Sequence, residues 1–167
     1  AADGLEAKMA RKPARFANLK HTYCPVTSLR ALDERRRACD WRNVNQTIKL
    51  TSAHDGFELP ALSARPVSAP IGGVVVIQEI FGLTEHIGEC CAIFANAGYA
   101  TLAPGLFDRI ERNFQATLDG PGIEKGRNAV MASPWPQVVG DVQTAMHPLP
   151  QPCYVARFCY GGAGHWM

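Results

Sequence analysis

A cysteine near the end of the chain is the residue type best placed to do chemistry. Cys159 follows the apolar run Cys153–Ala156 and precedes the small residues Gly161 and Gly162. A reactive side chain on a sharp turn between a strand and a helix is typical of a nucleophile elbow. The amino end of such a helix stabilises the thiolate, which is the nucleophilic form of cysteine. We therefore predict a nucleophile at Cys159; a buried structural cysteine is the alternative.

A carboxylate in the first half of the chain is the second candidate. Glu79 directly follows Gly73–Gln78, a β-branched run without polar alternation. Such a run is typical of a strand buried on both faces, as in a parallel sheet. Open α/β sheets bind ligands at the carboxyl ends of their strands. Glu79 is therefore predicted to lie at a site rather than only to solvate a loop.

Local patterns predict the elements that would hold these two residues. After the strand at 73–78, Thr84 can cap a helix whose apolar stripe is spaced i, i+3, i+4, i+7, and Gly98 ends that helix. A strand at 99–103 follows and stops at Pro104, which completes a βαβ unit. A helix is predicted at 135–147 and a short one near 123–131. The segment 153–156 is expected to be a third buried strand.

The segment from residue 46 to Leu62 predicts a hairpin ahead of this unit. Residues 47–51 alternate between apolar and polar side chains, and Asp55-Gly56 is a turn signal. The return strand at 57–62 contains Pro60, which predicts an edge position because proline lacks an N–H.

Composition and charge limit the classes of protein. With 47% apolar and 19% charged residues, the 167-residue chain has the composition of a globular protein. Residues 1–46 hold ten Lys/Arg and five Asp/Glu, a net +5, and the remainder is −3. We divide the chain into an irregular or disordered basic extension, 1–45, and a folded domain, 46–167. A basic extension can contact nucleic acid or anionic lipid, but a solvated tail is the simpler interpretation.

The remaining features exclude several cofactors and compartments. The six cysteines show neither C-x-x-C nor zinc-type spacing, and no stretch reads as a secretory signal or a membrane span. We expect free thiols in the cytoplasm, no metal, no organic cofactor, and no nucleic-acid or membrane partner.

Three segments of the chain, taken together, resemble the dienelactone hydrolase family, also called carboxymethylenebutenolidases. The resemblance covers roughly residues 46 to 163. The matching segments are Val76-Ile77-Gln78-Glu79-Ile80-Phe81-Gly82-Leu83, Ala97-Gly98-Tyr99-Ala100-Thr101-Leu102-Ala103-Pro104, and Phe158-Cys159-Tyr160-Gly161-Gly162. The resemblance implies an α/β fold: a three-layer, α/β-hydrolase-like, mostly parallel sheet, of which this chain holds the N-terminal part only.

The same resemblance implies a reaction and a role for each site residue. The family hydrolyses an enol-lactone ester through a Cys-His-Asp triad. Cys159 would be the nucleophile, Glu79 the carboxylate that helps to activate it, and the backbone N–H groups of Ile80 and Tyr160 the oxyanion hole. Arg109 and Arg127 lie where the family holds a substrate carboxylate; solvated surface charge is the alternative for both. The expected partner is a small lactone or ester.

Departures from the family pattern define a competing hypothesis. Arg157 and Gly105 stand where the family has glycine and aspartate, and only Tyr160 to Met167 follow the cysteine. We therefore expect the acid and the histidine of the triad to be missing from this chain, which would impair the hydrolase, and we expect neither His86 nor His165 to replace the histidine. One alternative is thus an inactive, truncated member that acts by association. Its last strand would leave a sheet edge uncovered, which favours self-association.

Overall fold

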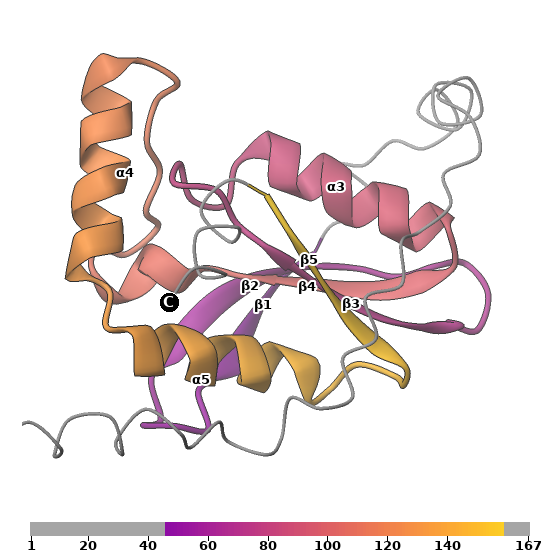
Figure 1. The fold of residues 1–167 in the computed structure, drawn as a ribbon. Coiled ribbons are helices and arrows are strands. Elements are labelled where there is room, and N and C mark those ends of the chain that lie inside the picture. Colours follow the sequence, from indigo (N-terminus) through magenta and orange to yellow (C-terminus); the bar gives the residue numbers. More distant parts are fainter. Residues whose placement is uncertain (1–45, 159–167) are drawn as a thin grey trace, which may run out of the picture.

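The computed structural model describes residues 46–158 and shows a mixed sheet with helices on its two faces (Figure 1). Its elements are β1 (Gln46–Thr51), β2 (Glu58–Ala64), β3 (Gly72–Ile77), α3 (Glu85–Asn96), β4 (Tyr99–Pro104), the 3₁₀ helix η2 (Leu106–Arg109), α4 (Gly120–Ala132), α5 (Trp135–Met146) and β5 (Cys153–Arg157). The predicted extension 1–45 lies outside these residues.

The sheet has the strand order β1-β2-β4-β3-β5. Strands β4 and β5 both run parallel to β3, while β2 runs antiparallel to its two neighbours, β1 and β4. All strands except β2 therefore point the same way, which confirms the predicted mostly parallel sheet. The carboxyl ends of β3, β4 and β5 consequently meet at one edge, here called the carboxyl edge.

Two apolar layers enclose the sheet, because β3 sends alternate side chains to opposite faces. Val75 and Ile77 pack in the cluster that includes α5, and Val74 and Val76 pack in the cluster that includes α3. All six residues of β3 are buried, as predicted. Each buried Val or Ile side chain stabilises the fold by roughly 1.5–3 kcal/mol. The continuous apolar run at 73–77 is thus explained by a strand covered on both faces (Figure 1).

Helix α3 confirms the predicted helix and most of its apolar stripe. Ile87, Cys90 and Cys91 are buried against the sheet, and Phe94 is half-buried. Thr84 occupies the N-cap position, but its side chain makes no capping hydrogen bond. Gly98 has φ +98°, a conformation that an L side chain rarely adopts. The chain therefore reverses at Gly98 and enters β4.

Two predictions about strands were wrong: the edge position of β2 and the full burial of β5. β2 is an internal strand, because it pairs with both β1 and β4. Pro60 is accommodated there because the ladder with β4 begins one residue later, at Ala61 and Pro104. β5 is paired only with β3, and of its residues only Cys153 is buried. Within residues 46–158, β5 is thus an edge strand and not a fully buried one.

Helix α4 is longer than the predicted segment near 123–131. It begins at Gly120, where the Asp119 carboxylate accepts a hydrogen bond of 2.8 Å from the Gly122 N–H. A Gly-Pro-Gly sequence usually indicates a turn, but proline is tolerated in the first turn of a helix because the N–H groups there have no helical acceptor. The Asp119 cap therefore favours the first turn of a helix over a turn at this sequence. In the described part of the chain, no helix combines the length and apolar character needed to cross a bilayer.

Candidate functional site

Glu79 lies at the carboxyl edge, immediately after β3. Its side chain is half-buried, and its carbonyl accepts a hydrogen bond of 3.2 Å from the Gly82 N–H. Residues 79–82 therefore form a tight turn at the end of the central strand. This is the position in the sheet that the sequence predicted for Glu79.

A neighbouring segment, residues 114–116, fixes this turn. The Ala116 N–H donates to the Phe81 carbonyl over 3.1 Å, and Gly82 forms a β-bridge with Gln115. Gly82 has φ +89°, and a Cβ there would lie 2.4 Å from the Phe114 carbonyl oxygen. Only glycine fits both the conformation and this approach, so the turn is positioned by contacts rather than by its own sequence.

Helix α4 supports the same turn at Ile80. A Cβ on Gly126 would lie 2.4 Å from the Ile80 carbonyl oxygen, so the absence of a side chain lets the helix approach closely. The buried positions of α4 are all small: Gly122, Gly126 and Ala129. No described backbone carbonyl accepts a hydrogen bond from the Ile80 N–H. The turn therefore presents a backbone donor next to Glu79.

Gln78 ties the ends of the two central strands together. Its side chain is 1% exposed, and its Oε1 accepts a hydrogen bond of 2.9 Å from the Leu106 N–H. Leu106 starts η2, directly after β4 and Gly105. Gln78 belongs to a segment that resembles the family, but the resemblance gives it no role. Its polar amide at the end of a wholly apolar buried strand is the feature of the sequence that could have pointed to this role.

At position 105 this chain has glycine where the family has aspartate, and the structure gives a steric reason for it. A Cβ there would lie 2.8 Å from Oδ1 of Asp108 and 3.0 Å from Cγ of Pro60. The Gly105 N–H also donates to the Pro60 carbonyl over 2.8 Å. Glycine at this position lets the end of β4 pack directly against β2.

Arg109 forms ion pairs with two aspartates, although the sequence placed it among the substrate-binding residues. Its Nε and Nη2 donate to Asp141 over 2.7 and 2.8 Å, and Nη1 and Nη2 donate to Asp55 over 2.8 and 3.0 Å. Its guanidinium carbon also lies 4.4 Å from the centroid of the Phe57 ring. These contacts join η2, the β1–β2 turn and α5. They favour a structural role, and substrate binding by Arg109 stays an untested prediction.

The charges in this cluster stabilise one another. Hydrogen bonds from Arg109 lower the pKa of Asp55 to about 2, and those to Asp141 raise the pKa of the guanidinium above its usual value. Asp141 is fully buried, so its carboxylate depends on Arg109 for compensation. Arg127, the other predicted arginine, is exposed on α4, and its role also stays a prediction.

The predicted nucleophile Cys159 and the oxyanion donor Tyr160 lie outside the described residues. The strand that leads to them is regular through its end: Arg157 is exposed and is the register partner of Ile77. Arg157 therefore does not interrupt the pairing of β5 with β3. The next residue, Phe158, contacts the His86 ring edge to face, with centroids 6.1 Å apart.

Two of the described cysteines, Cys91 and Cys153, differ in environment from a reactive thiol. Burial raises the pKa of the Cys91 thiol to about 12, and burial also raises the pKa of Cys153. Both therefore remain protonated near neutral pH and act as small apolar residues. Cys90 lies 3.8 Å from Nε2 of His86. Among residues 46–158 no three His, Cys, Asp or Glu side chains are grouped closely enough to hold a metal.

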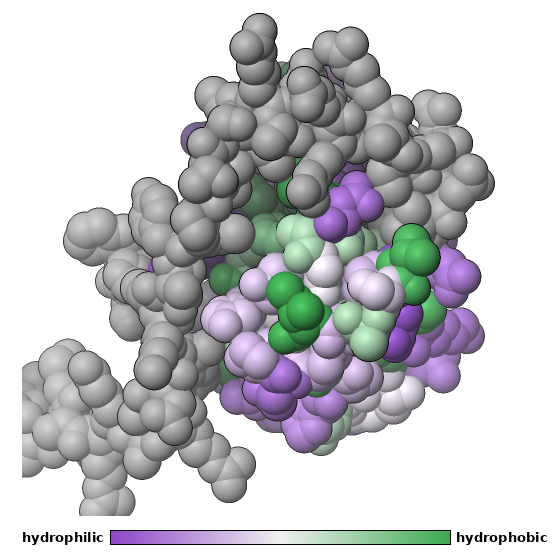
Figure 2. All heavy atoms as spheres, turned by 90° about the vertical axis from the view of Figure 1, so that its right-hand side faces the viewer, coloured by the Kyte–Doolittle hydropathy of each residue, from purple (hydrophilic) through white to green (hydrophobic). Residues whose placement is uncertain are grey.

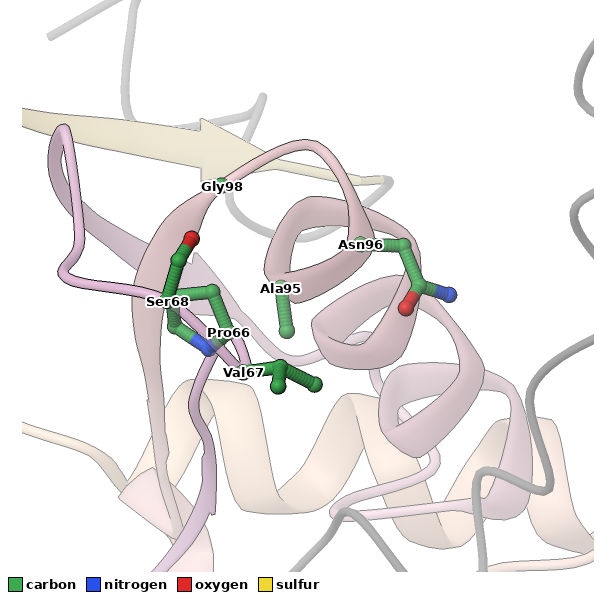
Figure 3. A pocket seen from close by; sticks show the side chains of 6 residues that line it. All are labelled: Pro66, Val67, Ser68, Ala95, Asn96 and Gly98. Atoms are coloured by element: carbon green, nitrogen blue, oxygen red, sulfur yellow. The ribbon is translucent and has the colours of Figure 1, made fainter.

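A hollow of about 280 Å³ lies next to the amino end of β4, away from the carboxyl edge. The connection after β2 faces the last turn of α3 across it (Figure 3). Its six lining residues, none of them ionisable, are Pro66, Val67, Ser68, Ala95, Asn96 and Gly98. Figure 2 shows the right-hand side of Figure 1, where the described surface is a mosaic of polar residues and isolated apolar ones. The lining of the hollow thus offers no acid or base that could activate its one hydroxyl, Ser68.

The mostly parallel sheet lies between two layers of helices, and the turn that contains Glu79 lies at its carboxyl edge. This architecture places the chain in the class of α/β hydrolases. The family model described as "Dienelactone hydrolase family" matches residues 59–165, which is 107 of the 167 residues. The chain belongs to the dienelactone hydrolase family, as the sequence predicted.

Curated relatives and solved structures agree with this assignment. A "Putative carboxymethylenebutenolidase" of Escherichia coli K12 is 33% identical over 124 residues, which are 67% of this chain and 43% of that protein. One of Synechocystis sp. with the same name is 28% identical over 127 residues, with shares of 70% and 51%. A crystal structure described as a putative dienelactone hydrolase from Klebsiella pneumoniae has a TM-score of 0.54 and 29% identity, with shares of 72% and 52%. The chain thus spans about half the length of these relatives.

Proposed function

We propose that the protein hydrolyses a lactone or another carboxylic ester through Cys159. The observation that carries this proposal is the register of two neighbouring parallel strands. Ile77 in β3 is paired with Arg157 in β5, and Glu79 and Cys159 each come two residues later. Together with family membership, this register supports a shared site at the carboxyl edge.

The proposed reaction has two halves. The Cys159 thiol gives its proton to Glu79, the sulfur attacks the carbonyl carbon, and the carbon–oxygen bond to the alcohol part breaks as that oxygen takes the same proton from Glu79. Water then gives one proton to Glu79 and attacks the thioester. The carboxylic acid is released, and the sulfur regains a proton from Glu79, which restores the thiol and the carboxylate. The Ile80 and Tyr160 N–H groups would hold the oxyanion in both halves. Free thiols suit a reducing cytoplasm, where we place the reaction.

Acyl transfer from p-nitrophenyl acetate tests the proposal directly. We expect nitrophenolate release together with one acetyl group on Cys159, located by peptide mass spectrometry. Mapping separates this site from the buried thiols Cys91 and Cys153, which we expect to remain unlabelled. A chain that acquires no acetyl group, or acquires it on another cysteine, contradicts the proposal.

A second candidate is self-association through β5. Within the described residues this strand is paired only with β3, and Tyr154, Val155 and Ala156 are half-exposed. An edge strand offers unpaired N–H and C=O groups to a second copy of the chain. We expect a dimer in light scattering that dissociates when Val155→Pro removes an N–H from the edge. A monomer at all concentrations, or a dimer unchanged by this substitution, contradicts the pairing.

A further inference from the structure

Asp108 in η2 is a buried carboxylate that the proposed reaction does not use. It is only 6% exposed, and its Oδ2 accepts a hydrogen bond of 2.8 Å from the Asn113 N–H. Burial raises the pKa of this carboxyl, although hydrogen bonds from the Asn113 and Phe114 N–H groups and the charge of Arg112 oppose the rise. Burying a charge is unfavourable because the charge loses its bonds to water. The fold therefore tolerates an unfavourable burial, and the described hydrogen bonds to this carboxylate come from one short backbone segment.

That segment, residues 113–116, is here called the strap, and it lies against the turn that contains Glu79. It begins at Asn113, which has φ +56°, a left-handed conformation that asparagine adopts more readily than most residues. At its other end the Ala116 N–H donates to the Phe81 carbonyl over 3.1 Å. The strap is therefore bonded to the η2 carboxylate at one end and to the turn at the other.

Helix α4 also contacts the strap, through a more exposed side chain. Nζ of Lys125 donates to the Gln115 carbonyl and to the Glu111 carboxylate, each over 2.9 Å, but the Lys125 side chain is 40% exposed. Exposed ion pairs contribute little to stability, because water screens them. The Asp108 carboxylate is shielded from water, where a hydrogen bond is stronger. We therefore expect the strap to depend more on Asp108 than on Lys125.

The apolar contacts of the strap do not fix the direction of its backbone. Phe114 is 4% exposed and packs edge to face on Phe107, with ring centroids 5.1 Å apart. Apolar burial holds a side chain in the core but is not directional. Hydrogen bonds are directional, so the bonds to the Asp108 carboxylate orient the peptide groups of the strap.

We propose that Asp108 is a positioning residue for the turn at residues 79–82. Its carboxylate fixes the backbone of the strap, and the strap holds the turn that carries Glu79 and the Ile80 N–H. Asp108 touches no reacting atom in this role and acts only through the strap. The effect on the turn follows from contacts among described residues, and the effect on ester cleavage rests on the proposed function.

Two substitutions separate this role from a general contribution to stability. Asp108→Ala removes the acceptor, whereas Asp108→Asn keeps one oxygen for the Asn113 N–H. We expect hydrogen exchange of the Ala116 and Gly82 amides, followed by NMR, to become about 10-fold faster in Asp108→Ala, since a lost hydrogen bond in a shielded place changes an equilibrium by roughly this factor. Asp108→Asn should restore the exchange rates of the unsubstituted chain. The amides of β3, which report global unfolding, should change less than those of the turn.

Lys125→Met is the matched control, because it removes the exposed contact of the strap and leaves the buried one. It should change exchange at Ala116 by less than about threefold. Unchanged exchange at the turn in Asp108→Ala would overturn the inference, since the packing of Phe114 would then suffice to hold the strap. An equal acceleration of the β3 amides would overturn it as well, because Asp108 would then stabilise the whole fold and not the turn.

Exchange in the unsubstituted chain decides the inference even if a variant at position 108 does not fold. The Asn113, Ala116 and Gly82 amides should open as one unit, with protection factors that agree within about threefold. A Gly82 amide that stays protected while the other two exchange overturns the inference, because the turn would then not depend on the strap. These measurements need no ester. Absence of acetylation at Cys159 would instead overturn the proposed function and leave the exchange pattern unchanged, so the two failures are distinguishable.

Discussion

Replacing Cys159 with alanine is expected to abolish the burst of nitrophenolate in the first turnover and the acetyl group that the chain acquires. Cys159 supplies the sulfur that takes up the acyl group, so the acyl-enzyme route is lost without it, and binding and the oxyanion donors leave only a remnant of the rate. The measurement is the rate of nitrophenolate release from p-nitrophenyl acetate, both in the first turnover and at steady state.

Cys91→Ala is the matched control for this substitution. Burial raises the pKa of Cys91 to about 12, so its thiol is protonated at neutral pH and should contribute nothing to the reaction. We expect Cys91→Ala to keep the rate of the unsubstituted chain. If Cys159→Ala retained most of the activity, or if Cys91→Ala lost it, the assignment of the nucleophile would be wrong.

Replacing Asp141 with alanine is expected to lower the free energy of unfolding by about 3 kcal/mol, the lower end of the range for breaking a buried ion pair. Asp141 is fully buried and accepts two hydrogen bonds from Arg109, whose side chain is only 10% exposed. The substitution leaves the guanidinium half compensated, since only Asp55 still pairs with it. Urea unfolding followed by circular dichroism gives the change.

Two further variants test whether the loss comes from the unpaired charge. Asp55→Ala removes the more exposed partner, so it should cost less than Asp141→Ala. Adding Arg109→Met to Asp141→Ala removes the charge itself and should recover part of the stability, because an apolar pair replaces an orphaned cation. If both aspartate substitutions lowered the free energy of unfolding equally, or if the double variant recovered none of it, the uncompensated charge of Arg109 would not be the cause of the loss.

The ion-pair partners of Arg109 could not have been predicted from the sequence. An arginine after a strand end, in a chain resembling a family that binds carboxylates, is a reasonable candidate for an anion site. Its actual partners are separated from it by 54 and 32 residues. No local pattern reports contacts over such distances, so the use of the guanidinium became visible only once β1, η2 and α5 were packed together.

Local patterns by themselves determined the βαβ unit and its helix ends. The apolar run at 73–77, the stripe on 87–94 and the glycine at 98 each act within one turn or one strand, so neighbouring residues suffice to specify them. The same reasoning placed Glu79 at the end of a central strand. Family membership followed from short contiguous segments, which a sequence displays directly.

Tertiary structure alone decided the internal place of Pro60 and the support of the Glu79 turn. Strand order depends on which distant segments pair, and Pro60 is acceptable in an internal strand because the ladder with β4 begins only after it. The close approaches at Gly82 and Gly126 and the hydrogen bond from the Leu106 N–H to Gln78 arise where separate elements meet. Such features depend on three-dimensional packing, which the residue order specifies only through the whole fold.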